Sequence, residues 1–205
     1  MPESADDLHA RITAAAGPDG RLPAPPVAEW ATFPWEAADS RLVPRAVRAP
    51  EPEPPRQGDP GGDPCIMCAG FSPDRIVWED EHWQLTCFPE PSGMPLVLTL
   101  WTREHKDIGT FGDEDASELG RIANRLVRIM EGMPGIGRVH VNRWGEGCSH
   151  AHVWFHARPE GLPDVRGKHV TEWDQILPPV PVEVWRADLH TVATKLANWG
   201  GTARA

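Results

Sequence analysis

The sequence predicts an α+β domain in which an antiparallel sheet of about five strands packs against one long helix. Short apolar or alternating segments recur between turn residues, and residues 113–131 carry apolar side chains at helical spacing. Three histidines also lie close together, at positions 150, 152 and 156. Because side chains two residues apart share one face of a strand, a strand over 149–157 would present His150, His152 and His156 together.

Composition limits the classes of function. The chain has 205 residues, of which 40% are hydrophobic, and a net charge of -10, so we expect one domain with extensions. The negative charge argues against nucleic-acid and anionic-membrane partners. The N-terminus lacks a basic region followed by an apolar run, and no apolar stretch approaches the length of a membrane span. We therefore expect a cytoplasmic protein, whose four cysteines indicate metal binding or free thiols before disulfides.

The chain divides into three segments. Residues 1–62 contain a short helix near 6–16 and then a proline-rich arm, which cannot form a packed core. We expect Trp30, Phe33 and Trp35 to anchor this arm on the main domain, which covers residues 63–160. Residues 161–205 form a C-terminal extension that packs on that domain.

The individual elements follow from local patterns. Apolar alternation or wholly apolar runs between turn signals predict strands at 75–78, 82–88, 95–101, 138–142, 149–157 and 179–186. The run 95–101 is apolar throughout and should be a buried central strand. Apolar residues spaced three and four apart predict the helix over 113–131, with acidic residues at its start and Gly132 after its end. A second helix is expected over 189–198.

A pair of cysteines suggests a metal site. Cys65 and Cys68 have the Cys-x-x-Cys spacing, which suits tetrahedral zinc. The same spacing serves redox chemistry, but that use is expected at a helix start within a βαβ pattern, which is absent here. A metal site needs two more ligands, and His105, directly after the apolar strand, is the obvious third. A redox-responsive zinc protein remains an alternative that rests on the cysteine pair alone.

Taken in order, these pieces resemble the histidine-triad superfamily. That superfamily includes zinc-containing hydrolases and galactose-1-phosphate uridylyltransferase-like proteins. The resemblance covers about residues 63–160 and includes the cysteine pair, the strand leading to His105, the long helix, a strand ending in Asn142, and a histidine strand that begins near Ser149. It implies a zinc-stapled meander with helices on one side, and a homodimer as one assembly. It also implies cleavage or transfer of nucleotidyl groups, so the expected partner is a nucleotide or a phosphorylated, anionic metabolite.

The superfamily motif can be placed in two registers. Its pattern is Ser-x-x-His-x-His-x-His, and alignment on Ser149 puts the three histidine positions at His152, Trp154 and His156. The middle position holds the superfamily's nucleophile, and an indole has no basic nitrogen to perform the attack. The resemblance then implies a structural zinc site at Cys65, Cys68, His105 and His152.

In that first register the function would be binding without turnover, or altered chemistry in which His150 and His156 act as acid and base. In the second register His150 is the first triad histidine and ligates zinc, His152 is the nucleophile, and Trp154 takes the third place. An enzyme and a non-catalytic binder are thus distinguished by which histidine holds the metal. The residues expected to contact substrate are Asn142, Arg143, Ser149, Trp154 and Arg158.

Overall fold

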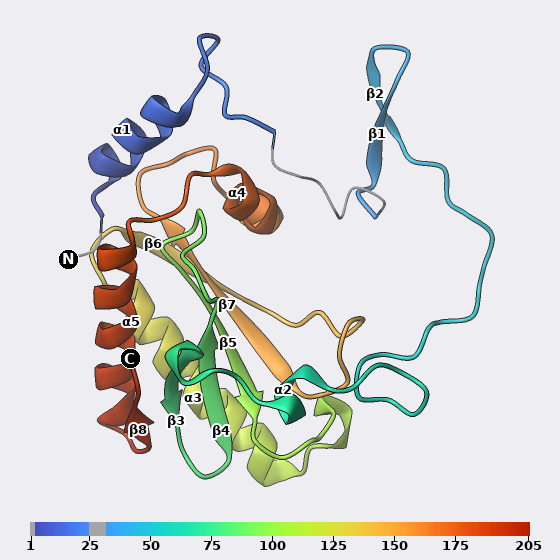
Figure 1. Ribbon diagram of the computed structural model, residues 1–205, viewed down its shortest axis with the longest axis vertical. Coiled ribbons are helices and arrows are strands. Elements are labelled where there is room, and N and C mark those ends of the chain that lie inside the picture. The colour runs from blue at the N-terminus through green and yellow to red at the C-terminus, as the bar shows by residue number, and fades with distance from the viewer. Residues whose placement is uncertain (1–2, 25–31) are drawn as a thin grey trace.

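The computed structural model describes residues 3–24 and 32–205. Its main body is a six-stranded antiparallel sheet in the order β6-β7-β5-β4-β3-β8 (Figure 1). The strands are β3 (Ile76–Glu79), β4 (Trp83–Cys87), β5 (Leu96–Thr102), β6 (Ile136–Asn142), β7 (His152–Pro159) and β8 (Thr202–Ala203). The helices are α1 (Ala5–Ala15), α2 (Ile66–Ala69), α3 (Asp113–Glu131), α4 (Val170–Ile176) and α5 (Val182–Ala197). The predicted α+β class is confirmed.

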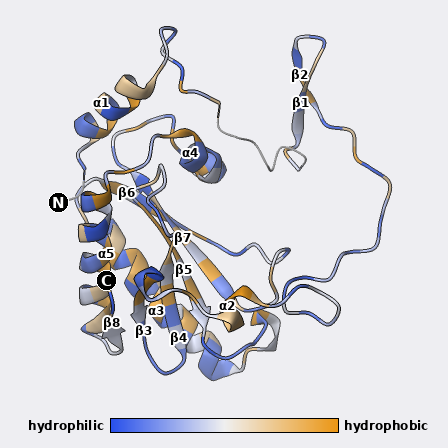
Figure 2. Cartoon of the chain, viewed as in Figure 1, coloured by the Kyte–Doolittle hydropathy of each residue, from blue (hydrophilic) through white to orange (hydrophobic). Residues whose placement is uncertain are grey.

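One face of the sheet carries the main hydrophobic core. The central strand β5 is buried along its whole length, and its residues Leu98 and Leu100 are fully inaccessible. They pack with Leu126 of α3 and Val192 of α5, so these two helices form the layer over this face. Hydrophobic residues accordingly run along the central strands in Figure 2. Burial of this apolar surface is the main favourable contribution to folding.

The opposite face is covered by shorter segments. Val97 of β5 packs with Val170 and Leu177, which come from the C-terminal extension. Farther along the same strand, Trp101 packs with Met67 of α2 and with Cys148. This second face carries the even-numbered residues of β7, because the odd-numbered ones point into the main core.

The arm departs from the prediction. Residues 35–44 form a separate hairpin of β1 (Trp35–Ala38) and β2 (Arg41–Pro44), which stands away from the body in Figure 1. Trp35 is 41% exposed, so it does not anchor the arm, and Trp30 lies outside the described residues. The arm is held instead by residues 56–59, described below.

Two other expectations differ from the structure. The strand predicted over 179–186 is wrong, because Pro181 caps α5, which begins at Val182. The buried residues of α5, among them Leu189 and Val192, follow helical spacing from that point. The helix α4, the hairpin and the two-residue strand β8 were not predicted. Within residues 3–24 and 32–205, no helix is both long and apolar enough to span a membrane.

Candidate metal centre and the adjoining histidine strand

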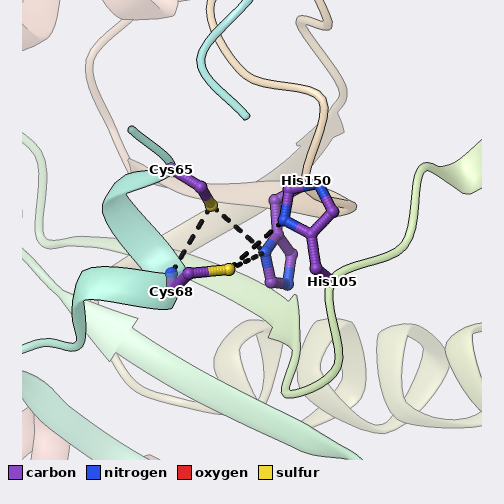
Figure 3. Close-up of side chains that lie close together, drawn as sticks. All are labelled: Cys65, Cys68, His105 and His150. Carbon is purple, nitrogen blue, oxygen red and sulfur yellow. Dashed lines mark hydrogen bonds between the residues drawn. The ribbon is translucent and has the colours of Figure 1, made fainter. Parts of the chain in front are cut away.

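Four side chains from three segments converge on one point. Cys65 caps the N-terminus of the short helix α2 and Cys68 lies within it, His105 comes from the loop after β5, and His150 comes from the turn that enters β7. Figure 3 shows all four side chains pointing toward one another. Their donor atoms lie within 4.8 Å of one another, which is close enough for all four to ligate one ion.

The spacing and chemistry of this cluster fit a tetrahedral ion. The Nδ1 atom of His150 lies 3.3 Å from Cys65 Sγ and 3.7 Å from Cys68 Sγ, and Cys68 Sγ lies 3.2 Å from His105 Nδ1. Ligands bound at typical zinc–nitrogen and zinc–sulfur lengths stand roughly 3.3–3.8 Å apart in a tetrahedron. Two thiols and two imidazoles are therefore arranged as a structural metal site requires.

The second nitrogen of each histidine ring is also placed as in a metal site. His150 Nε2 lies 2.7 Å from the carbonyl oxygen of Thr102, to which it donates when Nδ1 is the ligand. His105 Nε2 lies 3.5 Å from the hydroxyl of Ser149. Such outer contacts fix the tautomer and the orientation of ligating imidazoles. Burial lowers the pKa of His150, which favours the neutral ring that binds metals.

The cluster contains His150 where the first register expected His152. His152 offers no donor atom to the cluster, because its ring lies on the indole of Trp101. His150 lies just before β7, where the amide of Ala151 donates to the carbonyl of Lys106 and draws this turn toward the loop of His105. His152 is already within the strand and pairs with Trp101 of β5.

His152 lies directly beside the cluster, with one ring nitrogen committed. Its Nδ1 lies 2.8 Å from the carbonyl oxygen of His150 and must donate the proton, because a carbonyl only accepts. Its ring packs on the indole of Trp101, with the ring centroids 4.9 Å apart and an angle of 32° between the ring planes. Within the described residues, no hydrogen bond engages Nε2. Nδ1 therefore carries a proton in this contact, and Nε2 is the ring nitrogen left without a hydrogen-bond partner.

The other even-numbered aromatic residues of β7 form a row beyond His152. The ring of Trp154 lies edge-on to the ring of His152, with 6.4 Å between the ring centroids. It also packs on the rings of His156 and Phe88, at centroid distances of 5.9 Å and 5.7 Å. Trp144 covers His156 edge-on at 5.7 Å. This face is thus continuously aromatic from the metal cluster toward the middle of β7.

The structure does not bring His150 and His156 together as an acid–base pair. His150 belongs to the cluster, whereas His156 lies on the far side of Trp154 and is 4% exposed. Burial, together with the nearby His140, lowers the pKa of His156 to about 4. Its ring is neutral near pH 7, and its Nδ1 is buried without a partner among the described residues.

The remaining expected substrate residues have separate positions. Asn142 faces Trp154 across the β6–β7 pair. Arg143 forms an ion pair with Asp107 at 3.2 Å, and Arg158 donates to the carbonyl of Pro159 at the far end of β7. Ser149 donates its hydroxyl proton to the carbonyl of Gln57, 3.1 Å away, so it joins the arm to the metal centre.

Residues 56–59, here called the strap, lie across the metal centre. This contact was not predicted from the sequence. The amide of Gln57 donates to the carbonyl of Gly147, and its own carbonyl accepts from the amide of Ser149. Gly58 has φ +87°, and a Cβ there would come within 2.6 Å of His105 Cε1. Only a glycine fits this close approach with this backbone conformation.

An ion-pair network fixes the strap to the loop of His105. Arg56 lies 2.7 Å from Asp107 and 2.9 Å from Asp59. Burial opposes the ionisation of Asp107, but the hydrogen bond from Arg56 holds the pKa of Asp107 below its usual value. Within the sequence these residues were part of a proline- and glycine-rich linker, so nothing indicated their partners.

No protein-family model matches the chain, and no curated protein matches it. Solved structures do show similarity. A histidine triad protein from Marinobacter aquaeolei matches with 17% identity over 60% of this chain and 88% of its own, at a TM-score of 0.48. One from Sinorhizobium meliloti matches with 17% identity over 62% and 98%, at a TM-score of 0.49.

A third similar structure is described as a zinc-bound histidine triad family protein from Mycobacterium smegmatis. It matches with 16% identity over 63% of this chain and 94% of its own, at a TM-score of 0.44. All three are described as histidine-triad proteins.

Proposed function

We propose that this chain is a zinc-stapled enzyme that cleaves or transfers nucleotidyl or related phosphoryl groups, with His152 as its nucleophile. One observation supports this more than any other. His150 completes the Cys/His cluster, which leaves the imidazole of His152 outside it, with Nδ1 bonded to the carbonyl of His150. This is the arrangement expected of the second register of the histidine-triad motif.

The chemistry follows from the tautomer of His152. With the proton on Nδ1, the lone pair of Nε2 attacks the phosphorus of a phosphoanhydride or phosphoramidate substrate and forms an N–P bond. The P–O or P–N bond to the leaving group breaks, and that group departs with the bonding electrons and takes up a proton. Water or an acceptor hydroxyl then attacks the same phosphorus, loses its proton, and returns the electron pair to Nε2.

The metal would support this site without taking part in the reaction. Cys65, Cys68, His105 and His150 would hold zinc with four protein ligands, so no position is left for substrate or water. When bound, zinc supplies folding energy and fixes the backbone of His150. That backbone in turn carries the carbonyl that orients His152.

In the second register Trp154 takes the third triad position and limits the proton transfer available there. Its indole N–H donates one hydrogen bond and cannot exchange a proton with a leaving group. With Phe88 it forms an aromatic wall next to His152. We infer that this wall contacts the part of the substrate that adjoins the phosphorus, while Asn142 lies opposite on β6.

The test is a turnover assay on purified, zinc-loaded protein with a panel of adenosine and uridine polyphosphates, phosphoramidates and nucleotide sugars. The parent, His152→Ala and Trp154→His are compared, with zinc content measured for each. We expect the parent to turn over at least one substrate. We expect His152→Ala to lose that activity by at least about a thousandfold, as for removal of a nucleophile, while it retains zinc.

A non-catalytic binding protein is the second candidate, and it is supported by the burial of His152, which is only 6% exposed. It predicts a zinc-loaded parent that binds a nucleotide in equilibrium titrations but does not turn it over. If Trp154→His alone gained hydrolysis, the nucleophile would lie at position 154, and the role proposed for His152 would be wrong.

A further inference from the structure

A groove between α3 and α5 lies on the helical layer, on the side of the sheet opposite the metal centre. Two hollows flank the side chain of Trp199 there, one of about 260 Å³ toward Trp78 and one of about 230 Å³ toward Gly132. Trp199 is 51% exposed, although most large aromatic side chains bury more of their surface. The groove is therefore an aromatic surface open to solvent.

The backbone holds Trp199 in this outward position. Trp78 donates its indole proton to the carbonyl of Gly200 at 2.9 Å. Gly201 has φ +74°, and a Cβ at that residue would come within 2.5 Å of the Trp78 ring. These two contacts hold the turn after α5 against the sheet. The same turn holds Trp199 with its side chain exposed.

The smaller hollow is basic in a chain whose net charge is -10, whereas the larger hollow is lined by Asp80 and Glu118 as well as by Arg121 and Arg125. Arg125 places its guanidinium 5.5 Å from the centre of the Trp199 ring, and Arg128 and Lys195 line the smaller hollow. Across residues 3–24 and 32–205, Arg121 pairs with Glu118, but no carboxylate lies within ion-pair distance of those three cations. Three unpaired cations around one tryptophan fit an anionic partner.

The proline-rich arm has the complementary composition. Residues 50–55 read Pro-Glu-Pro-Glu-Pro-Pro and are all exposed, and neither Glu51 nor Glu53 has an ion-pair partner within the described residues. Four prolines in six residues fix φ near the polyproline II value. The neighbouring hairpin also exposes Leu42 at 68%, and Val47 after it is 98% exposed. Within the described residues, the segment 50–55 is therefore open to a partner outside its own body.

We propose that the α3–α5 groove binds residues 50–55 of a second copy of this chain, so that the protein self-associates through its arm. Polyproline II segments dock into aromatic-lined grooves because their conformation is already formed and little entropy is lost. Trp199 provides the aromatic surface for the prolines. Arg125, Arg128 and Lys195 pair with Glu51 and Glu53 of the other copy.

The arm of the same copy is a poorer occupant. The strap ties the end of the arm to Asp107 and Ser149 at the metal centre, and the arm leaves the body there (Figure 1).

Charged contacts at such a groove determine specificity and make association sensitive to salt. This proposal does not depend on the proposed catalytic function.

A charge-exchange experiment on the full-length protein tests the proposal. Sedimentation velocity is measured over about a hundredfold range of protein concentration, because association obeys mass action. We expect the parent to associate, and the double variants Glu51→Lys/Glu53→Lys and Arg128→Glu/Lys195→Glu each to associate at least about tenfold more weakly. An equimolar mixture of the two variants should associate as the parent does, because each reversed arm then meets a reversed groove.

A matched control separates the arm from net charge. Glu160→Lys/Glu183→Lys makes the same change in charge at exposed sites outside the arm and groove, and should leave association unchanged. The proposal is overturned if the parent stays monomeric at every concentration, or if either variant associates as strongly as the parent. It is also overturned if the mixture does not recover. All substituted arm and groove residues are exposed, and equal melting temperatures confirm intact folds.

Discussion

The carbonyl oxygen of His150 lies 2.8 Å from Nδ1 of His152, so the residue that completes the metal cluster also sets the proton position on its neighbour. The two side chains lie two residues apart but have different partners. The ring of His150 faces the thiols of Cys65 and Cys68, whereas the ring of His152 lies on Trp101. This division of roles leads directly to the first prediction.

His150→Ala should abolish stable metal binding, and His152→Ala should leave it intact. Removing one of four ligands opens the site and weakens a structural zinc site, whereas His152 contributes no donor atom to the cluster. Zinc content after dialysis, measured by atomic spectrometry, distinguishes the two variants. The ligand set is wrong if His152→Ala loses zinc while His150→Ala retains it.

Removal of the proposed zinc should destabilise the protein, because ligand binding to the native state adds to its stability. The ligands join α2, the loop after β5 and the start of β7, so these segments should lose protection together. Hydrogen exchange before and after chelation measures this effect. Strands β3 and β4 provide an internal reference, since neither contributes a ligand to the cluster.

Gly58→Ala should destabilise the protein by about 1–3 kcal/mol, because it combines a positive φ with a close contact. The new Cβ would stand 2.6 Å from His105 Cε1 and 2.9 Å from Ser149 Oγ, so metal retention should weaken as well. Gly61→Ala is the matched control, since Gly61 has φ +84° and nothing within 4 Å of the added Cβ. Equal loss of stability in both variants would mean that the strap does not press on the metal centre.

His156 should make the protein less stable in mild acid. Its pKa falls from about 6.5 in the unfolded chain to about 4 in the fold, because the buried ring excludes charge. The unfolded state therefore binds the extra proton first, and stability is lost as the pH falls from 6.5 toward 4. The full effect is about 3 kcal/mol.

His156→Phe removes this titration and keeps an aromatic ring of similar position. The free energy of unfolding, measured with urea at several pH values, should fall less steeply toward acid in this variant than in the parent. Burial raises the pKa of Asp188 to about 6, so its protonation acts in the opposite direction over the same range. The comparison with His156→Phe cancels that contribution, and identical slopes would contradict the role given to His156.

The fold was largely predictable because most of its elements have strong local patterns. The helix α3 has the bounds that its apolar spacing predicted, and β5 is the buried central strand expected from its uninterrupted apolar run. The C-terminal extension was harder, since Val182 and Val184 are typical of strands, and only their packing shows that they begin α5. The two-residue strand β8 exists through its pairing with β3 and has no signal of its own.

The candidate site was predictable in composition but not in register. Cys65, Cys68 and His105 follow from spacing and order along the chain, and the structure brings them together. The choice between His150 and His152 depends on where β7 begins, which a strand pattern does not determine to one residue. Ser149 was the anchor of the alignment, yet its hydroxyl contacts Gln57 in the arm, a long-range contact that no local pattern contains.

The strap also bears on the order in which the protein matures during synthesis. Cys65 and His150 are 85 residues apart, and Gln57 and Ser149 are 92 residues apart. The thiols and the strap therefore leave the ribosome long before the histidine and serine that complete their contacts. Closure of the metal centre is a late event, and until then the nascent chain carries two uncovered thiols beside an undocked arm.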